Sequence, residues 1–506
     1  MAKGKPVRGE PAAAKADLEL LEAIKQTVPS ALNIERERRV YVHRTLRMDE
    51  IELIGFDMDY TLALYNQRNL ERLSIQCTLE KLIAKHDYPE SVLKLDYNPE
   101  FAVRGIVIDR RYGNLLKMDR FGHVGRVYHG HRLLSKEERR ALYQVERIRL
   151  SLPRYALIDT LFALPEAVMY AAIVEHLEHA GKRVNYNQLW ADIRECIDMA
   201  HRDESLKSVI KASLSDFIER DPDLAPTLHK FRSSGKRLFL LTNSAWDYTD
   251  AVMTYLLDGA LPAYASWRGY FDIVVVSGQK PGFFTDSKPF LELDGSGAPK
   301  GEASGPFLRN RIYQGGNIHD FEKMAGQSGD RVLYIGDHIY GDMLRAKKSS
   351  VWRTAMILQE LEDELRQLGR NKEKMRRLDE LDRQCARLDS EIDYHQLLLK
   401  SLHKEVDHNG APDSSVAKHE AKARLDELRN ALRSSSMELE QLENEIDRAF
   451  NPYWGAMFRE GTENSRFGEQ VEDYACVYTS RVSNFLAYSP LRYFRSPRDH
   501  MPHELV

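Results

Sequence analysis

Four short apolar runs, each followed at once by polar side chains, constrain the fold of this 506-residue chain more than any other feature. They lie at residues 51–57, 237–242, 272–277 and 332–337, and helical sequence separates them. Short, β-branched and nearly continuous apolar runs are typical of parallel strands that are covered on both faces. The runs therefore predict a doubly wound α/β fold, in which ligands bind at the carboxyl ends of the strands.

The first run leads directly into two acidic residues, Asp57 and Asp59. Two carboxylates in so tight a turn repel each other unless a cation or a proton lies between them. The pair therefore indicates a Mg²⁺ site with Asp57 as the nucleophile and Asp59 as the general acid and base. Taken alone, such a pair also fits an ordinary solvated turn.

The next two runs end in groups that suit a phosphate. Thr242 and Asn243 offer hydroxyl, amide and backbone donors just before the start of a helix, which is a favourable place for an anion. Lys280 follows the third run and can neutralise phosphoryl oxygens during attack by a carboxylate. Read one at a time, the hydroxyl residues also fit helix caps, and the lysine also fits a solvated loop.

The fourth run completes a metal site. Asp337 and Asp342 supply oxygen ligands of the kind that Mg²⁺ prefers. The predicted ligands are thus Asp57, Asp59 and Asp337, with Asp342 in support. Each acid could instead form an ordinary turn, but suitable groups at four strand ends, in one order, are hard to attribute to chance.

The spacing of the runs predicts several domains. About 175 residues separate the first two runs, too many for a simple crossover, so this span must hold an inserted domain placed to cover the active site. The predicted divisions are a polar tail or helix at 1–35, a catalytic core at 36–65 and 220–357, an inserted α+β cap at 66–219, a helical hairpin at 358–449, and a segment at 450–506 that packs on the core.

The hairpin prediction depends on apolar residues that step by three and four. They run from Leu378 to Ile392 and from Leu425 to Ile446, and a helix-breaking stretch at 408–415 lies between them. This pattern indicates two antiparallel helices of coiled-coil type with a charged exterior. A structural arm and a partner-binding arm both remain open.

Composition excludes several classes of protein. A net charge of −4 argues against a general nucleic-acid binder. The four cysteines are far apart, which argues against a disulfide framework or zinc cluster and fits a reducing compartment. No window is long and apolar enough to span a bilayer, and the N-terminus lacks a secretion signal. We therefore expect a cytoplasmic protein with neither nucleic-acid nor membrane partners.

The order of these motifs resembles the haloacid dehalogenase superfamily, in its phosphatase branch. Longer stretches resemble the cytosolic purine 5′-nucleotidases specific for IMP and GMP, and the match runs from about residue 38 to the end. These stretches are residues 56–63, 111–117, 159–166, 334–342 and 501–504. The resemblance implies Mg²⁺-dependent hydrolysis of 6-oxopurine nucleoside monophosphates through an aspartyl phosphate, with phosphotransfer to nucleosides as a further activity. We also expect a homo-oligomer, either a dimer or a tetramer.

The same resemblance implies a substrate site in the insertion. Arg194 and Asp198 would read the 6-oxo edge and the ring N–H groups of the base, with His201 on the same helix face. Phe162 would stack on the base, and Lys207 would assist near the phosphate. Without the resemblance, Arg194 and Asp198 also fit a surface ion pair.

Several questions stay open at this point. Members of the family respond to ATP-like effectors, but here Asp159 stands where the family has an amide, and its carboxylate would repel a triphosphate; Arg149 and Lys348 remain available to bind one. The preferred base and the balance of hydrolysis and transfer are also open. The alternatives are a phosphatase of the same superfamily for another phosphorylated metabolite, and a scaffold protein that uses the helical hairpin.

Overall fold

The structure is a computed structural model that describes residues 22, 34–144, 148–344, 350–409, 412–498, 500, 501 and 504. It divides into two compact units, one formed by Met1–Glu362 with Met457–Val506 and the other by Asp363–Ala456. Most of the predicted tail at 1–35 lies outside the described residues, and so does Lys348.

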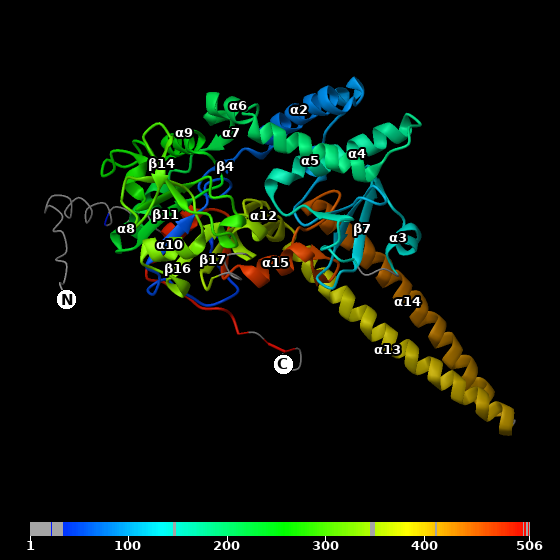
Figure 1. Ribbon diagram of the computed structural model, residues 1–506. Coiled ribbons are helices and arrows are strands. Elements are labelled where there is room, and N and C mark those ends of the chain that lie inside the picture. Colours follow the sequence, from blue (N-terminus) through cyan, green and yellow to red (C-terminus); the bar gives the residue numbers. More distant parts are fainter. Residues whose placement is uncertain are drawn as a thin grey trace. The chain divides into compact units, whose positions relative to one another are not determined.

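The first unit is built on a ten-stranded sheet, in which the strands from β20 to β15 run parallel (Figure 1). In spatial order the strands are β1 (Tyr41–Val42), β20 (Val477–Thr479), β17 (Arg353–Ile357), β16 (Val332–Gly336), β3 (Leu53–Phe56), β11 (Arg237–Leu241), β12 (Ile273–Val276), β15 (Ile312–Gly315), β13 (Phe290–Leu293) and β14 (Pro299–Glu302). The four predicted runs are β3, β11, β12 and β16. All residues of β3, β12 and β16 are buried, as expected for strands covered on both faces. The predicted doubly wound α/β fold is confirmed.

Helices link the parallel strands. They are α8 (Leu224–Ser233), α9 (Trp246–Leu257) and α10 (Ile318–Ala325), with the short turns η5 (Trp267–Tyr270), η6 (Gly282–Phe284), η7 (Gly329–Arg331) and the π-helical η8 (Ile339–Leu344). Packing inside the sheet is close. A Cβ atom at Gly55 in β3 would lie 1.9 Å from Cζ of Phe239 in β11, so only glycine fits there.

The chain leaves this core after β4 (Leu64–Tyr65) and returns at β10 (Ile218–Glu219), and these two strands pair antiparallel. The intervening segment forms its own five-stranded sheet, whose spatial order is β8 (Arg132–Leu133), β7 (Val124–His129), β6 (Asn114–Met118), β5 (Val107–Asp109) and β9 (Tyr155–Leu157). Within this sheet, the consecutive strands β5 and β6 pair antiparallel.

Helices and short turns complete this inserted segment. They are α2 (Gln67–His86), α3 (Lys136–Tyr143), α4 (Leu164–His179), α5 (Tyr186–Arg202), α6 (Lys207–Ala212), α7 (Leu214–Phe217), η2 (Glu90–Lys94), η3 (Pro99–Phe101) and η4 (Leu161–Ala163). The helices α2, α4 and α5 pack against one another. Every residue of α4 from Leu164 to Val174 is buried, which explains its almost wholly apolar sequence.

The C-terminal part of the first unit adds β18 (Arg459–Glu460), β19 (Glu463–Asn464), α15 (Arg466–Tyr474), β20, η9 (Val482–Ala487) and β21 (Tyr493–Phe494). Near the N-terminal end lie η1 (Arg36–Arg38) and β2 (Leu46–Arg47), and β2 pairs with β21.

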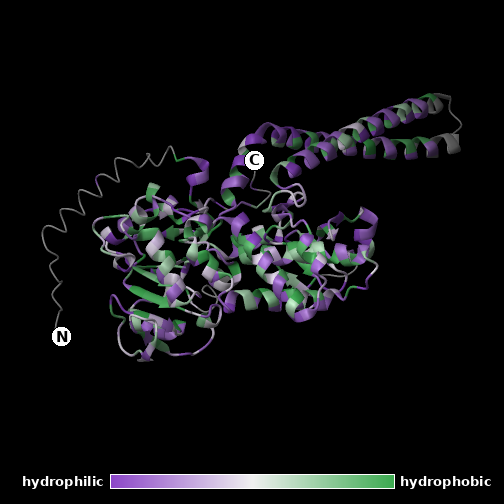
Figure 2. Ribbon diagram, turned by 90° about the horizontal axis from the view of Figure 1, so that it is seen from above, coloured by the Kyte–Doolittle hydropathy of each residue, from purple (hydrophilic) through white to green (hydrophobic). Residues whose placement is uncertain are grey.

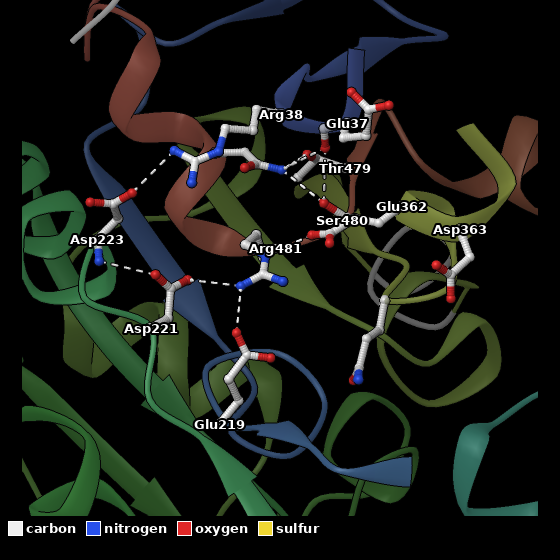
Figure 3. Close-up of polar contacts among 12 residues, drawn as sticks. Glu37, Arg38, Glu219, Asp221, Asp223, Glu362, Asp363, Thr479, Ser480 and Arg481 are labelled. Carbon is white, nitrogen blue, oxygen red and sulfur yellow. Dashed lines mark hydrogen bonds and ion pairs between the residues drawn. The ribbon is translucent and has the colours of Figure 1, made fainter. Parts of the chain in front are cut away.

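Arg481 joins this C-terminal part to the core by ion pairs (Figure 3). Its guanidinium lies 2.7 Å from Glu362, 3.1 Å from Glu219 and 3.9 Å from Asp221. Burial disfavours the charge, but Glu362 and Glu219 outweigh burial, and the pKa of Arg481 is raised.

After α12 (Leu361–Arg370), the second unit consists mainly of two long helices, α13 (Lys372–Asn409) and α14 (Pro412–Phe450). Their pairing is antiparallel, because Lys374 contacts Glu445 at 3.0 Å and Arg377 contacts Glu438 at 2.8 Å. The apolar residues that step by three and four form the seam, and the best buried of them are Leu381, Ile392, Leu425, Leu428 and Ile446. Figure 2 shows hydrophilic residues interspersed with hydrophobic ones along both helices.

Within the described part of the chain, none of the helices combines the length and apolar character that crossing a membrane requires.

Candidate active site

Asp57 follows β3 directly and lies at the carboxyl edge of the sheet. Its backbone N–H donates to the carbonyl of Ile335 in β16 at 2.9 Å, which continues the ladder by one residue. Its Oδ1 atom accepts a hydrogen bond of 2.8 Å from the N–H of Met58. The backbone therefore holds this carboxylate beside the end of β16.

Lys280, from the loop after β12, lies beneath the acidic groups. Its buried ammonium is 2.9 Å from Oδ1 of Asp57 and 2.8 Å from Oδ1 of Asp342, and it donates to the hydroxyl of Tyr334 at 2.9 Å. Burial disfavours the ammonium, but Asp342 and Asp57 outweigh burial, and the pKa of Lys280 is raised. The charge of Lys280 thus balances part of the acidic cluster.

Asn243 holds the backbone of Lys280 in place. Its amide oxygen accepts from the Lys280 N–H at 2.6 Å, and its amide nitrogen donates to the Lys280 carbonyl at 2.9 Å. Thr242 is fully buried, and its hydroxyl accepts from the N–H of Ser244 at 3.1 Å. Of the three predicted phosphate ligands, only Asn243 lines the cavity above the site.

Three carboxylates lie close enough to share one cation. They belong to Asp57, Asp337 and Asp342, all are buried, and their ligand atoms lie within 4.8 Å of one another. The Oδ2 atom of Asp337 is buried without a hydrogen-bond partner. A hard divalent cation with oxygen ligands fits this donor set, because three buried acids and one lysine leave negative charge unbalanced.

The electrostatics agree with this fit. Burial, followed by Asp342, raises the pKa of Asp337 to about 7. Burial also raises the pKa of Asp57 well above its usual range, although Lys280 opposes the shift. A bound cation would reverse both effects, since it favours the ionised carboxylates. Among the described residues, Asp59 is not part of the three-carboxylate cluster.

Hydroxyl groups hold Asp59 on both of its oxygens. Tyr65 donates to Oδ1 at 2.6 Å and Ser244 donates to Oδ2 at 2.8 Å. The hydroxyls of Tyr65 and Tyr248 are 2.9 Å apart. Burial and the nearby Asp59 raise the pKa of Tyr65, so it remains a hydrogen-bond donor. Reasoning from the sequence missed Tyr65 and Tyr248, and no pattern in the sequence links them to Asp59.

The last residue of β16, Gly336, can only be a glycine. A Cβ atom there would lie 2.5 Å from Oδ2 of Asp342. The same oxygen accepts a hydrogen bond of 3.2 Å from the N–H of His338. Gly336 is therefore required for Asp337 and Asp342 to turn toward the same point.

A cavity of about 340 Å³ lies beside Asp57, Asp59 and Asp337. Residues of both the core and the inserted segment line it. All five residues predicted to bind the substrate line it, together with both acids of the first run: Phe162, Arg194, Asp198, His201, Lys207, Asp57 and Asp59. The structure thus brings together residues that are widely separated in the sequence. Their individual roles remain predictions.

Arg194 pairs more closely with Glu166 than with Asp198. Its guanidinium is 2.5 Å from Glu166 and 3.4 Å from Asp198. Burial raises the pKa of Glu166 to about 7, although Arg194 opposes the shift. In the sequence, Glu166 is the last residue of the family-like stretch 159–166 and the single acid of the apolar run 164–174.

Phe162 lies at the wall of the cavity among other rings. Its centroid is 4.6 Å from that of Tyr60, 6.1 Å from Tyr65 and 5.8 Å from His201, in each case edge to face. Burial, aided by the nearby Lys207, lowers the pKa of His201. An aromatic wall of this kind suits a flat, uncharged ring.

Asp159 forms an ion pair with His338 at 3.3 Å. Burial opposes protonation of His338, but Asp159 outweighs it and raises the pKa of His338 to about 9. The Asp159 carboxylate, which we expected to repel a triphosphate, is therefore paired with the imidazolium of His338 in the loop that follows β16.

Comparisons with known proteins agree with this chemistry. The profile of the 5′ nucleotidase family matches residues 40–506. A 5′-nucleotidase domain-containing protein of Dictyostelium discoideum is 28% identical over 478 residues, covering 92% of this chain and 74% of its own. The 5′-nucleotidase domain-containing protein 2 of Rattus norvegicus is 27% identical over 488 residues, covering 94% and 82%.

Solved structures add little. A 2-haloacid dehalogenase from Pseudomonas syringae pv. Tomato DC3000 is 14% identical with a TM-score of 0.22, covering 61% of this chain and 86% of its own. A similarity this weak supports no conclusion about the chain. The family match, by contrast, extends over nearly the whole sequence and includes every residue of the site. The chain therefore belongs to the 5′ nucleotidase family and is a phosphoric monoester hydrolase.

Proposed function

We propose that this protein is a Mg²⁺-dependent 5′-nucleotidase that hydrolyses 6-oxopurine nucleoside monophosphates, of the IMP and GMP type, through an aspartyl phosphate on Asp57. One observation carries the proposal. The buried carboxylates of Asp57 and Asp337 line the same cavity as Arg194 and Asp198, a donor and an acceptor suited to a 6-oxopurine edge.

The first step would form the covalent intermediate. A carboxylate oxygen of Asp57 attacks the phosphorus, and the bond from phosphorus to the 5′ oxygen breaks. Asp59, oriented by Tyr65 and Ser244, gives its proton to the leaving oxygen. Lys280 lies 2.9 Å from Asp57 and can stabilise the negative charge that develops on the phosphoryl oxygens. Mg²⁺ held by Asp57, Asp337 and Asp342 would supply Lewis-acid stabilisation of those oxygens.

The second step would release phosphate. Asp59, now ionised, accepts a proton from water as the water oxygen attacks phosphorus, and the bond to Asp57 breaks. A nucleoside 5′ hydroxyl in place of water would give phosphotransfer with the same residues. We propose this transfer as a second outcome of the same intermediate.

The cavity suggests how the base would be held. Arg194 can donate to a 6-oxo group, and Asp198 can accept from a ring N–H. Phe162 offers an aromatic surface in the same cavity, and His201 and Lys207 also line it. A 6-amino base would place a donor against the Arg194 guanidinium, which leaves polar groups unpaired and weakens binding.

Release of phosphate from a panel of substrates tests this function. We expect IMP or GMP to be cleaved with a higher kcat/KM than AMP, pyrimidine nucleotides and sugar phosphates, and only with Mg²⁺. Asp57→Asn should abolish both phosphate release and the acid-stable labelling of the protein by phosphate. A higher kcat/KM for a sugar phosphate would refute the substrate, and activity retained by Asp57→Asn would refute the mechanism.

Two further expectations belong to this proposal. We expect the protein to be cytoplasmic, and all four of its cysteines have free thiols. We also expect a dimer or tetramer in solution, which light scattering at several protein concentrations measures.

A further inference from the structure

Arg104 is a fully buried arginine that the mechanism above does not use. It lies just before β5, in the inserted segment, and 1% of its surface is exposed. Its Nε and Nη2 atoms donate to the two oxygens of Glu360 at 2.7 and 2.6 Å. The guanidinium also lies 5.0 Å from the centroid of the Phe467 ring. The group is thus fixed in position from two sides.

A further donor of this guanidinium points to the loop that contains Asp337. The Nη1 atom of Arg104 donates to the backbone carbonyl of Asp337 at 3.0 Å. Asp337 carries the buried Oδ2 atom that lacks a hydrogen-bond partner. Arg104 therefore holds the main chain of a predicted ligand while the carboxylate of that ligand stays available.

A second residue of the inserted segment contacts the next residue of the loop. Asp159 pairs with His338 at 3.3 Å, and the N–H of His338 donates to Asp342, another of the three clustered acids. Arg104 and Asp159 lie far apart in the sequence of the inserted segment, yet they contact consecutive residues of the core. Neither contact is needed to close the parallel sheet, because the ladder of β16 ends at Gly336.

We propose that Arg104, with Asp159, is a positioning residue that sets the geometry of the metal site from the inserted segment; this inference rests on the proposed Mg²⁺ site. Groups that orient metal ligands change metal affinity when they are lost. A planar guanidinium makes three directed hydrogen bonds at once, which an ammonium cannot reproduce. Arg104→Lys therefore keeps the charge and removes the orientation.

The inserted segment also contains a matched control. Arg154 forms a similar forked pair with Asp109, with both hydrogen bonds at 2.8 Å and Asp109 fully buried. That pair joins the residue before β9 to the last residue of β5, within the inserted segment. We expect both Arg154→Lys and Arg104→Lys to lower stability, but Arg154→Lys should leave the affinity for a metal unchanged.

The test is a titration of the substrate-free full-length protein with Mn²⁺, with the free ion followed by electron paramagnetic resonance. We expect Arg104→Lys to weaken Mn²⁺ binding about 10- to 100-fold and Asp159→Asn to weaken it by a smaller factor. Arg154→Lys should stay within about twofold of the wild type. In steady-state assays, the Mg²⁺ concentration that gives half-maximal activity should rise in Arg104→Lys and Asp159→Asn by factors similar to the loss of Mn²⁺ affinity.

The outcomes separate the inference from the function that it rests on. Unchanged Mn²⁺ affinity in both Arg104→Lys and Asp159→Asn, or equal weakening in Arg154→Lys, would overturn the positioning role. Asp337→Asn, which removes a predicted ligand, should abolish binding; if it does not, the metal site itself is wrong. If Arg104→Lys does not fold, the Mn²⁺ affinity of Asp159→Asn tests the positioning role instead. We expect Asp159→Asn to fold, because both side chains of the Asp159–His338 pair are partly exposed.

Discussion

The ammonium of Lys280 lies 2.9 Å from Oδ1 of Asp57, and this contact joins the predicted nucleophile to the rest of the acidic cluster. The same ammonium reaches Asp342 at 2.8 Å, so one cation is shared by acids from two strand ends. A lysine in this place favours the ionised form of Asp57, which is the form that attacks.

Lys280→Met should therefore remove both stability and activity. Loss of a buried partner leaves carboxylates uncompensated and costs about 3–5 kcal/mol of unfolding free energy without metal. We expect kcat to fall by at least about a hundredfold. Mg²⁺ should restore part of the lost stability, because a second cation can replace some of the missing charge; thermal unfolding with and without Mg²⁺ measures this recovery.

Lys236 provides the control for that prediction. It is also buried, but its ammonium donates to the backbone carbonyls of Met48 and Ile51. Lys236→Met should lose stability that Mg²⁺ does not restore. Equal recovery in the two variants would show that Mg²⁺ does not act at the Lys280 cluster.

Tyr65→Phe should lower kcat by about tenfold with little change in KM. The variant removes a hydrogen bond of 2.6 Å to Asp59 and leaves the aromatic ring in place. Misorientation of the acid and base affects the transition state more than substrate binding, so kcat and kcat/KM should fall together. Tyr97→Phe removes a hydroxyl that donates to the carbonyl of Val92, away from the cavity, so this variant should keep wild-type kcat.

Glu71 should make stability depend on pH. Burial raises its pKa to about 7, although a hydrogen bond from Gln67 opposes the shift. From the unfolded value of 4.5 up to about 7, the folded protein holds a proton that the unfolded chain releases. The free energy of unfolding should therefore fall as pH rises through that window, by up to about 3 kcal/mol in all.

Glu71→Gln should remove the contribution of this carboxyl group to the pH dependence, while the buried Glu166 and Asp337 keep theirs. The free energy of unfolding of the variant, relative to that of the wild type, should rise by about 1–3 kcal/mol as the pH is raised from about 5 to about 7.5. Denaturant unfolding at both pH values measures the gain. Glu80→Gln, on the exposed face of the same helix, should leave the pH dependence unchanged. A wild-type slope that persists in Glu71→Gln would contradict the assignment.

Arg481→Met should destabilise the first unit. The substitution leaves Glu362 and Glu219 without their shared partner, and the arginine side chain is only 22% exposed. We expect a loss of about 1–3 kcal/mol, seen as a lower thermal midpoint. Arg68 of α2 and Glu100 form an exposed pair, so Arg68→Met should cost less than about 1 kcal/mol.

The four strands at the centre of the sheet were predictable because their chemistry is local. A buried parallel strand must be apolar along its whole length, so β3, β11, β12 and β16 stand out from the sequence. The acids at their ends were predictable for the same reason. Strands that share a direction bring their carboxyl ends to one edge, and Asp57 is therefore expected to lie near Asp337.

The details around those acids were not predictable. Nothing in the sequence indicates that Tyr65 holds Asp59, that Glu166 holds Arg194, or that Tyr334 lies under Lys280. Each contact joins residues from separate elements, and its distance depends on how those elements pack. The involvement of Arg104 is the strongest case, since an arginine beside a glycine has no distinguishing pattern.

The sequence by itself therefore determined the α/β core, the acids and lysine at the strand ends, and the antiparallel helical hairpin. Each of these depends on periodicity or on neighbours along the chain. Only the tertiary structure decided which carboxylates share a site, which hydroxyls orient Asp59, and how the inserted segment contacts the loop at Asp337. The physical reason is that a buried charge is stabilised by partners from anywhere in the fold, and their positions follow from packing.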